Sequence, residues 1–208
     1  MNRLLLPRRI RKNIYYLRRI LWERMRGLDF SVFHEPESLG LDATTSHPYE
    51  PSPAGFLTKI AASLDIRSSD RLLDVGCGKG FALYVLSQFP FGAVDGIEIS
   101  PRLVRIAKTN LRKLGINSDI HLADVAQYHD LDRYNFFYLS NPFPSMVMKT
   151  FLENLKASLI RSPRTAKLLY FNPVCHSLVE TYAQKVERHE EYAERMNCGL
   201  FVYHLNNF

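Results

Sequence analysis

The sequence is poor in cysteine and tryptophan, and it has no long uncharged apolar run. It holds three cysteines and one tryptophan in 208 residues. Cys77, Cys175 and Cys198 form no C-x-x-C pair, which argues against a zinc site and a disulfide framework and favours a reducing, cytoplasmic compartment. The seven histidines lack the i, i+4 spacing of a helical metal pair, so we expect no metal. No uncharged stretch approaches the roughly 20 residues that a bilayer span requires.

Internal repeats and low-complexity segments are also absent from the sequence. Hydrophobic residues make up 46% of the chain and charged residues 23%, both near the globular average, so most of the chain is expected to fold. This length suits one α/β domain with an appendage better than two domains. We therefore predict a basic arm and cap over residues 1–51 and a single domain over residues 52–208.

Acidic residues are scarce in the first 30 positions. This segment holds nine Lys or Arg against Glu23 and Asp29, a net charge of +7, and the remaining 18 basic and 19 acidic residues give −1. Apolar residues recur there at spacings of three and four, which predicts a helix with one apolar stripe. The stripe consists of Ile10, Ile14, Leu17, Leu21, Met25 and Leu28. Packing on its own domain is the first interpretation, peripheral binding to an anionic membrane surface the second, and binding to nucleic acid or another polyanion the third.

Residues 31–51 show no periodicity and contain several prolines and a glycine, so they predict a loop that reaches over a site. The part from His47 to Pro53 is the best candidate for an ordered segment. Ser52 followed by Pro53 predicts the start of the next helix.

The most informative stretch is Arg71–Gly80, RLLDVGCGKG. An apolar run predicts a buried strand, a helix follows from Phe81, and three glycines alternate with single residues between them. Glycine leaves room for a ligand and tolerates positive φ. A P-loop is excluded because Lys79 precedes Gly80 rather than Ser or Thr, so Lys79 is expected to contribute little to ligand binding. A dinucleotide fingerprint is weakened because its third glycine would fall at Phe81.

The remaining pattern, D-x-G-x-G-x-G from Asp74 to Gly80, resembles the first motif of the class I S-adenosylmethionine (SAM) dependent methyltransferases. The resemblance extends from about Tyr49 to the end of the chain. It implies SAM as the cofactor and a three-layer Rossmann-like sandwich, with a seven-stranded, mostly parallel sheet whose last strand is antiparallel. Residues 184–193 and 200–205 would supply the final hairpin around a turn at Asn197–Gly199.

Two more acids stand near the ends of predicted strands. Glu98 lies near the end of strand 92–99, where a carboxylate can accept hydrogen bonds from both ribose hydroxyls. Asp124 closes strand 119–123; the resemblance implies that it pairs with the adenine amino group, and capping a helix from Val125 to Tyr128 is a compatible alternative. The predicted cofactor-binding residues are Asp74, Gly76, Cys77, Gly78, Gly80, Glu98, Asp124 and Val125.

Strand 134–140 ends at Asn141-Pro142-Phe143, followed by a second proline. This turn resembles the N-P-P-aromatic motif of amino-group methyltransferases and, more distantly, the non-SET histone lysine methyltransferases. The resemblance implies that Asn141 and a backbone carbonyl orient a target nitrogen and that an aromatic ring stacks on the substrate, although Phe143 stands one place early. We predict Asn141, Pro142 and Phe143 as catalytic residues, with a rigid structural turn as the alternative.

The predicted function is methyl transfer from SAM to an unidentified acceptor, with nitrogen favoured over oxygen. A hydroxyl acceptor would need a base such as His47, Glu50 or His176. The alternative from another class is a non-catalytic SAM-fold binding module, attached through residues 1–30 to a membrane surface or a polyanion.

Overall fold

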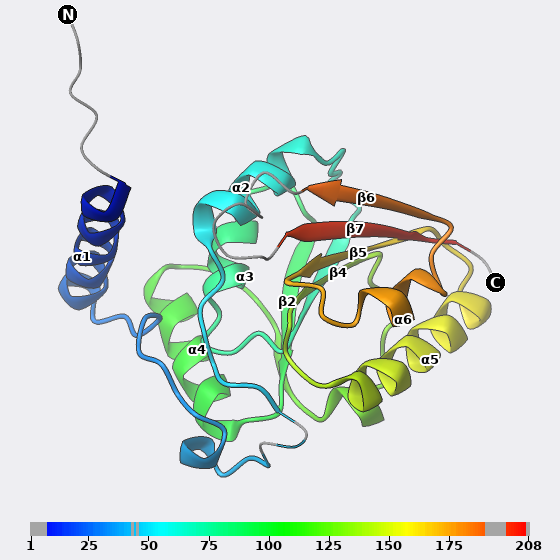
Figure 1. The fold of residues 1–208 in the computed structure, drawn as a ribbon, viewed down its shortest axis with the longest axis horizontal. Helices are drawn as coiled ribbons and strands as arrows, with labels where there is room; N and C mark the ends of the chain where they lie inside the picture. Colours follow the sequence, from blue (N-terminus) through cyan, green and yellow to red (C-terminus); the bar gives the residue numbers. More distant parts are fainter. Residues whose placement is uncertain (1–7, 43, 45, 190–198, 207–208) are drawn as a thin grey trace, which may run out of the picture.

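The chain forms a seven-stranded sheet with helices on both faces (Figure 1). A computed structural model describes residues 8–42, 44, 46–189 and 199–206. The strands are β1 (Arg71–Val75), β2 (Ala93–Glu98), β3 (Ile120–Leu122), β4 (Phe136–Ser140), β5 (Ala166–Phe171), β6 (Lys185–His189) and β7 (Leu200–Leu205). Their order across the sheet is β3-β2-β1-β4-β5-β7-β6. The first five run parallel, and β7 is antiparallel to both of its neighbours, which confirms the predicted sheet.

Two hydrophobic cores, one on each face, hold the layers together. The helices are α1 (Arg8–Arg26), α2 (Ala54–Ser63), α3 (Phe81–Leu86), α4 (Pro101–Lys113), α5 (Ser145–Arg161) and α6 (His176–Glu180), with short 3-10 turns η1 (Glu37–Leu39) and η2 (Val125–Gln127). Along β4, Phe136 and Tyr138 pack with α2, α3 and α4, while Phe137 and Leu139 pack with α5. Because both faces of the central strand are buried, the three-layer sandwich is confirmed. The turn expected at Asn197 lies outside the described residues.

The start of α4 follows the local sequence signals, whereas the start of α2 does not. Ser100 accepts a hydrogen bond from the N–H of Leu103 and Pro101 is the first helical residue, as predicted. Ser52, by contrast, does not cap α2. Its hydroxyl accepts a hydrogen bond from the buried hydroxyl of Tyr138 at 3.0 Å, and Pro53 takes the capping position. The buried phenol, which needs a partner, thus determines the role of Ser52.

Residues on both sides of the domain boundary expected between positions 51 and 52 belong to one hydrophobic core. Leu28 and Phe30 are buried in the same cluster as α3 and α4, and the rings of Phe30 and Phe81 meet edge to face with centroids 5.2 Å apart. The described residues between 28 and 51 then run across the carboxyl edge of the sheet, where Tyr49 pairs with His34 in an isolated bridge (Figure 1). We call residues 28–52 the strap.

Over residues 17–26, where the side chains of helix α1 are described, the helix does not pack through its apolar stripe. Leu17, Leu21 and Met25 are exposed. The helix meets the domain instead through Glu23, whose buried carboxylate accepts hydrogen bonds from Arg19, from the hydroxyl of Ser31 and from the N–H groups of Phe30 and Ser31. The helix thus contacts its own domain, as the first interpretation expects, but it does so through the face that carries Glu23. Of the stripe, Leu28 is buried just past the end of the helix, and the side chains of Ile10 and Ile14 lie outside those that the structure describes. Among the described residues, no helix is long and apolar enough to cross a membrane.

Candidate functional site

One cavity at the carboxyl edge of β1, β2 and β4 gathers nearly all of the predicted site residues. Parallel strands end at the same edge, where folds of this kind bind ligands. The cavity is lined by Asp74, Gly76, Cys77, Gly78, Glu98, Asp124, Val125, Asn141, Pro142 and Phe143. Strap residues 46–52 complete the wall, which confirms that this loop reaches over the site. Within the described ranges, no three His, Cys, Asp or Glu side chains come together as a metal site.

Gly80 is not among the residues that line the cavity. It stands before α3 with a φ of +82°, and a Cβ at this position would touch Ala107 and Leu111 at 3.4 to 3.5 Å. Gly80 therefore serves the close packing of α4 on the glycine turn rather than contact with a ligand.

The glycine turn is held by backbone hydrogen bonds. The N–H groups of Gly76 and Cys77 both donate to the carbonyl oxygen of Ile97, at 2.9 and 3.0 Å. The N–H of Gly78 donates to the carboxylate of Glu98 at 2.9 Å. A phosphate cradle requires several free N–H groups pointing at the ligand. Three consecutive donors of this turn, at Gly76, Cys77 and Gly78, are used within the chain, which agrees with the exclusion of a P-loop.

The space beside the two cavity glycines is filled by protein side chains. A Cβ on Gly76 would lie 2.6 Å from the Cβ of Pro142, and one on Gly78 would collide with the ring of Tyr49. Both glycines also have positive φ, +78° and +53°. The spacing of the glycines predicts that a ligand occupies this space. In the structure the glycines instead allow the strap and the Asn141-Pro142 turn to close on β1.

Glu98 is a buried carboxylate held in a fixed orientation. One oxygen accepts the N–H of Gly78 and the other the N–H of Ser100, each at 2.9 Å. Burial raises the pKa of Glu98, and the backbone hydrogen bonds oppose that rise. Each oxygen keeps acceptor capacity, because a carboxylate has about four lone-pair sites. The side chain is therefore positioned in the cavity wall before any ligand binds.

Asp74 is the buried acid with an unused oxygen. Its Oδ2 has no hydrogen-bond partner within the chain. Burial first, and the charge of Glu98 second, raise the pKa of Asp74 well above its ordinary value of 3.8. A buried polar atom without a partner in a cavity wall requires an explanation, and a ligand that brings a cation or a hydrogen-bond donor provides one.

Asp124 has the capping role that was predicted as an alternative. Its Oδ1 accepts the N–H of Ala126 at 2.9 Å and begins η2, which is shorter than the expected helix. Val125 follows as a buried residue of the second core and also lines the cavity.

The Asn141-Pro142 turn is bonded to the strap and to β5. Asn141 has a φ of +47°, a strained value for a residue other than glycine. The Nδ1 of His47 lies 2.9 Å from the carbonyl oxygen of Asn141, so Nδ1 carries the proton and donates it. The backbone N–H of His47 donates to the carbonyl of Pro142, and the hydroxyl of Tyr170 to Oδ1 of Asn141, both at 3.3 Å.

Phe143 and His176 differ from their predicted roles, and Asn172 offers a comparison for the Asn141 turn. Phe143 is buried against Phe151, with ring centroids 6.4 Å apart, so its ring is mainly a core side chain. Asn172 repeats the strained Asn-Pro turn at the end of β5 with a φ of +51°, yet it does not line the cavity, so such a turn also has a purely structural use. His176 bonds Tyr203 outside the cavity lining, which leaves His47 and Glu50 as the proposed bases that reach it.

Comparison with known proteins identifies the family. Residues 66–191 match the family described as "Methyltransferase domain". The chain belongs to this methyltransferase family. Together with the fold, this match makes it a class I SAM-dependent methyltransferase by family, and it favours an enzyme over the binding-module alternative.

The curated relatives of this methyltransferase share parts of its length. A protein-L-isoaspartate O-methyltransferase 2 from Anaeromyxobacter sp. (strain Fw109-5) is 35% identical over 49% of this chain and 36% of its own length. A protein-L-isoaspartate O-methyltransferase 1 from Archaeoglobus fulgidus is 28% identical over 74% of this chain and 82% of its own. Among solved structures, an RNA methyltransferase from Salinibacter ruber bound to S-adenosyl-L-homocysteine has a TM-score of 0.53 at 16% identity, covering 76% of this chain and 95% of that one. That structural likeness concerns the fold alone.

The cavity of the methyltransferase fits SAM on its own chemistry. The free oxygen of Asp74 suits a cationic amine, the oriented carboxylate of Glu98 suits two ribose hydroxyls, and Asp124 keeps one oxygen beyond its cap. These three residues would hold the cofactor, which supplies an electrophilic methyl group on a sulfonium.

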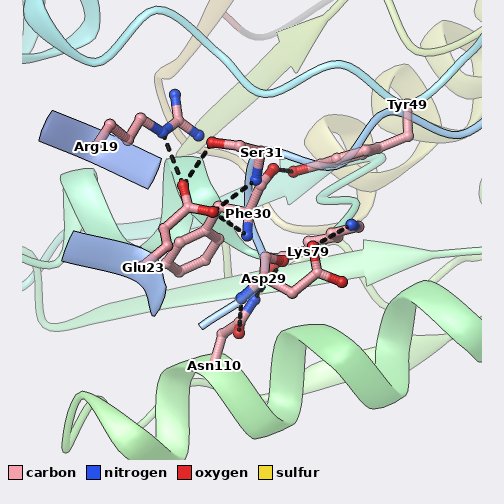
Figure 2. A network of polar contacts seen from close by, with 8 residues as sticks. All are labelled: Arg19, Glu23, Asp29, Phe30, Ser31, Tyr49, Lys79 and Asn110. Atoms are coloured by element: carbon pink, nitrogen blue, oxygen red, sulfur yellow. Dashed lines mark hydrogen bonds and ion pairs between the residues drawn. The ribbon is translucent and has the colours of Figure 1, made fainter. Parts of the chain in front are cut away.

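The strap is fastened to the glycine turn by a network of polar contacts that the sequence does not reveal (Figure 2). The buried Lys79 forms a 2.6 Å ion pair with Asp29 and stands 5.2 Å from the ring of Tyr49. The hydroxyl of Tyr49 donates to the carbonyl of Phe30 at 2.7 Å. Lys79 therefore has a structural role, because it holds the strap through Asp29. The sequence predicts only that Lys79 contributes little to ligand binding. A lysine between two glycines of a buried turn indicates that its charge needs a partner. The sequence does not identify Asp29 as that partner.

Proposed function

We propose that the methyltransferase transfers the methyl group of SAM to a carboxylate oxygen of a protein substrate, which gives a methyl ester. The observation that carries this proposal is the engagement of the acceptor atoms at the Asn141-Pro142 turn. The named activity of the two relatives, O-methylation of isoaspartyl proteins, supports the same acceptor class.

An amine acceptor needs hydrogen-bond acceptors that orient its lone pair. At this turn the carbonyl oxygens of Asn141 and Pro142 accept hydrogen bonds from His47, and Oδ1 of Asn141 accepts one from Tyr170. These contacts reduce what the turn can offer to an incoming N–H group. Each of these oxygens keeps a second lone pair, so the engagement weakens the case for a nitrogen acceptor, and the named activity of the relatives adds support for oxygen.

A carboxylate acceptor requires different protein side chains from those that an amine requires. It already carries a nucleophilic lone pair, so no base has to remove a proton. Methyl transfer is an in-line displacement, and the chain must mainly align the carboxylate and exclude water. Because Nδ1 of His47 donates to Asn141, the ring is held in one orientation in the cavity wall, and Nε2 is the ring nitrogen left for a group of the substrate. We assign this orienting role to His47.

The test is the chemical stability of the transferred label. The full chain would be incubated with methyl-labelled SAM and matched peptides that carry isoaspartate, aspartate or lysine. Label that enters the isoaspartyl peptide and leaves as volatile methanol on mild alkaline treatment identifies a methyl ester. Label that enters lysine and resists alkali contradicts the proposal.

Nitrogen methylation is the second candidate. It is favoured by the order of residues at Asn141-Pro142-Phe143, which resembles the amino-group motif. The lysine peptide of the same experiment tests it directly, because methylamines keep their label under alkaline conditions that cleave esters.

A further inference from the structure

The outward face of α1 carries apolar side chains that are open to solvent. Leu17, Leu21 and Met25 are 66%, 59% and 75% exposed, and Ile20 beside them is 38% exposed. The first three recur every four residues, so they form one continuous face of the helix. Figure 1 shows α1 standing at the edge of the domain, beside the sheet and its covering helices. We call these four residues the outer face.

The opposite side of α1 is fixed to the domain. Trp22 stacks on Phe30 with ring centroids 6.3 Å apart and lies 5.5 Å from Tyr84. Glu23 accepts hydrogen bonds from the strap, and Arg19 pairs with Glu23 at 3.0 Å (Figure 2). Because these contacts set the rotation of the helix, the outer face is held away from the core.

Positive charge surrounds the outer face. Arg18, Arg24 and Arg26 are exposed on the same helix, and residues 1–30 hold nine Lys or Arg against two acids. A second copy of the chain would bring two such positive segments together. A nucleic acid would neutralise the charge but would leave most of the apolar side chains in water. An anionic lipid surface satisfies both properties, because its headgroups attract arginine and its acyl boundary receives leucine and methionine.

We propose that α1 docks the methyltransferase on an anionic membrane surface, with Leu17, Leu21 and Met25 inserted at the headgroup boundary. The helix then lies in the plane of the surface, and the contacts of Trp22 and Glu23 attach the domain to the helix. This interaction is independent of the acceptor proposed above.

Vesicle sedimentation of the full chain tests the docking. Vesicles of phosphatidylglycerol and phosphatidylcholine should bind the protein at low salt, and vesicles of phosphatidylcholine alone should not. The variant Leu17→Gln/Leu21→Gln/Met25→Gln should bind about tenfold more weakly or worse, since three apolar side chains no longer enter the lipid. Raising the ionic strength to about 1 M, where the Debye length is about 3 Å, should release most of the bound wild type.

A matched control changes three exposed apolar residues away from α1. Leu122, Ile160 and Val174 are 55%, 58% and 69% exposed, so Leu122→Gln/Ile160→Gln/Val174→Gln removes a similar amount of apolar surface. This variant should bind anionic vesicles like the wild type. Both variants should keep their melting temperature within about 2 °C, because exposed sites rarely change stability by more than about 0.5 kcal/mol.

Three outcomes overturn the proposal. The wild type could ignore anionic vesicles at low salt. The outer-face variant could bind them as tightly as the control variant. The outer-face substitutions could leave vesicle binding intact and abolish self-association in analytical ultracentrifugation, which would make the outer face a contact between two copies.

Discussion

The ring of Tyr49 lies against Gly78 so closely that a side chain on the glycine would collide with it. This contact joins the strap to the turn that follows β1, and the N–H of the same glycine holds Glu98. The position of the strap and the orientation of the cavity carboxylate therefore depend on one residue without a side chain.

Gly78→Ala should disturb both the strap and the cavity. The matched control is Gly40→Ala, because Gly40 also has a positive φ, +71°, but has no atom within 4 Å of its would-be Cβ. Each variant places a Cβ in the left-handed backbone region, which costs about 1 to 2 kcal/mol. Gly78→Ala should lower the free energy of unfolding by about 1 kcal/mol more than the control, as an overpacked site does, and should also weaken SAM binding.

Urea denaturation and calorimetry with SAM would measure the two effects. Equal losses of stability in the two variants, with unchanged SAM affinity, would show that the strap yields to the added methyl group and that Tyr49 does not constrain the turn.

The ion pair between Lys79 and Asp29 should contribute to stability. Lys79 is buried and its partner is 40% exposed on the side chain, so removing the lysine leaves a partly shielded charge without its partner. Lys79→Met should cost about 2 kcal/mol, below the usual range for a fully buried pair. Lys185→Met is the control, since its pair with Glu187 has the same 2.6 Å distance but its lysine is 66% exposed rather than buried, so the pair should be worth at most about 1 kcal/mol.

Chemical denaturation of both lysine variants gives the comparison, and Asp29→Asn completes a double-mutant cycle. A Lys79 variant that is as stable as the Lys185 variant would remove the ion pair from the forces that hold the strap.

Local patterns made much of the fold predictable. Ser100 and Pro101 begin a helix by capping and by ring geometry, and both effects act within a few residues. The glycine turn between a buried strand and a helix predicts where the cavity lies. The acids Glu98 and Asp124 could then be found, because strands that run parallel must end at one edge.

The strap and the face of α1 were not predictable from local patterns. The periodicity of α1 predicts a helix and a stripe, but it does not say which side meets the domain. That choice depends on Glu23 and its donors at Phe30 and Ser31, which follow after a turn. Lys79 and Asp29 stand 50 positions apart, and no sequence spacing indicates that they meet.

The buried charge of Asp74 should make the cofactor-free protein more stable at lower pH. Its folded-state pKa is raised above the ordinary value of 3.8, so the folded state holds the proton more tightly than the unfolded state does. The free energy of unfolding should fall as pH rises from about 4 up through the raised pKa. Asp74→Asn should flatten this dependence and stabilise the free protein at pH 7 by about 1 kcal/mol or more.

The same substitution should weaken SAM binding, because it removes the charge next to the proposed amine. Melting temperatures from pH 4 to pH 8, with and without SAM, measure both effects. Asp74→Asn with unchanged pH dependence and full SAM affinity would remove Asp74 from the site.

Cofactor binding should depend on Glu98. Glu98→Ala should weaken SAM binding by about 1.5 to 3 kcal/mol, the usual worth of charge-assisted hydrogen bonds. Asp95→Asn is the control, because Asp95 is a buried carboxylate on the same strand that bonds Tyr134 and the N–H of Asp119 and does not line the cavity. The control should lose stability but keep its SAM affinity by calorimetry, and equal affinities in the two folded variants would contradict the ribose assignment.

The sign of the effect at Glu50 should distinguish an acidic substrate from a basic one. Glu50 is exposed and lines the cavity. Its charge repels a carboxylate acceptor and attracts an amine, by about 1 kcal/mol for charges some 4 Å apart in water. With an isoaspartyl peptide, Glu50→Gln should lower KM by about two- to fivefold at low salt and leave kcat unchanged, because a uniform binding term is altered. Glu37→Gln, an exposed acid outside the cavity lining, should change neither constant. The difference should shrink as salt screens the charge. A KM that rises in Glu50→Gln would mean that the cavity draws in a cation, and the nitrogen acceptor would then replace the carboxylate.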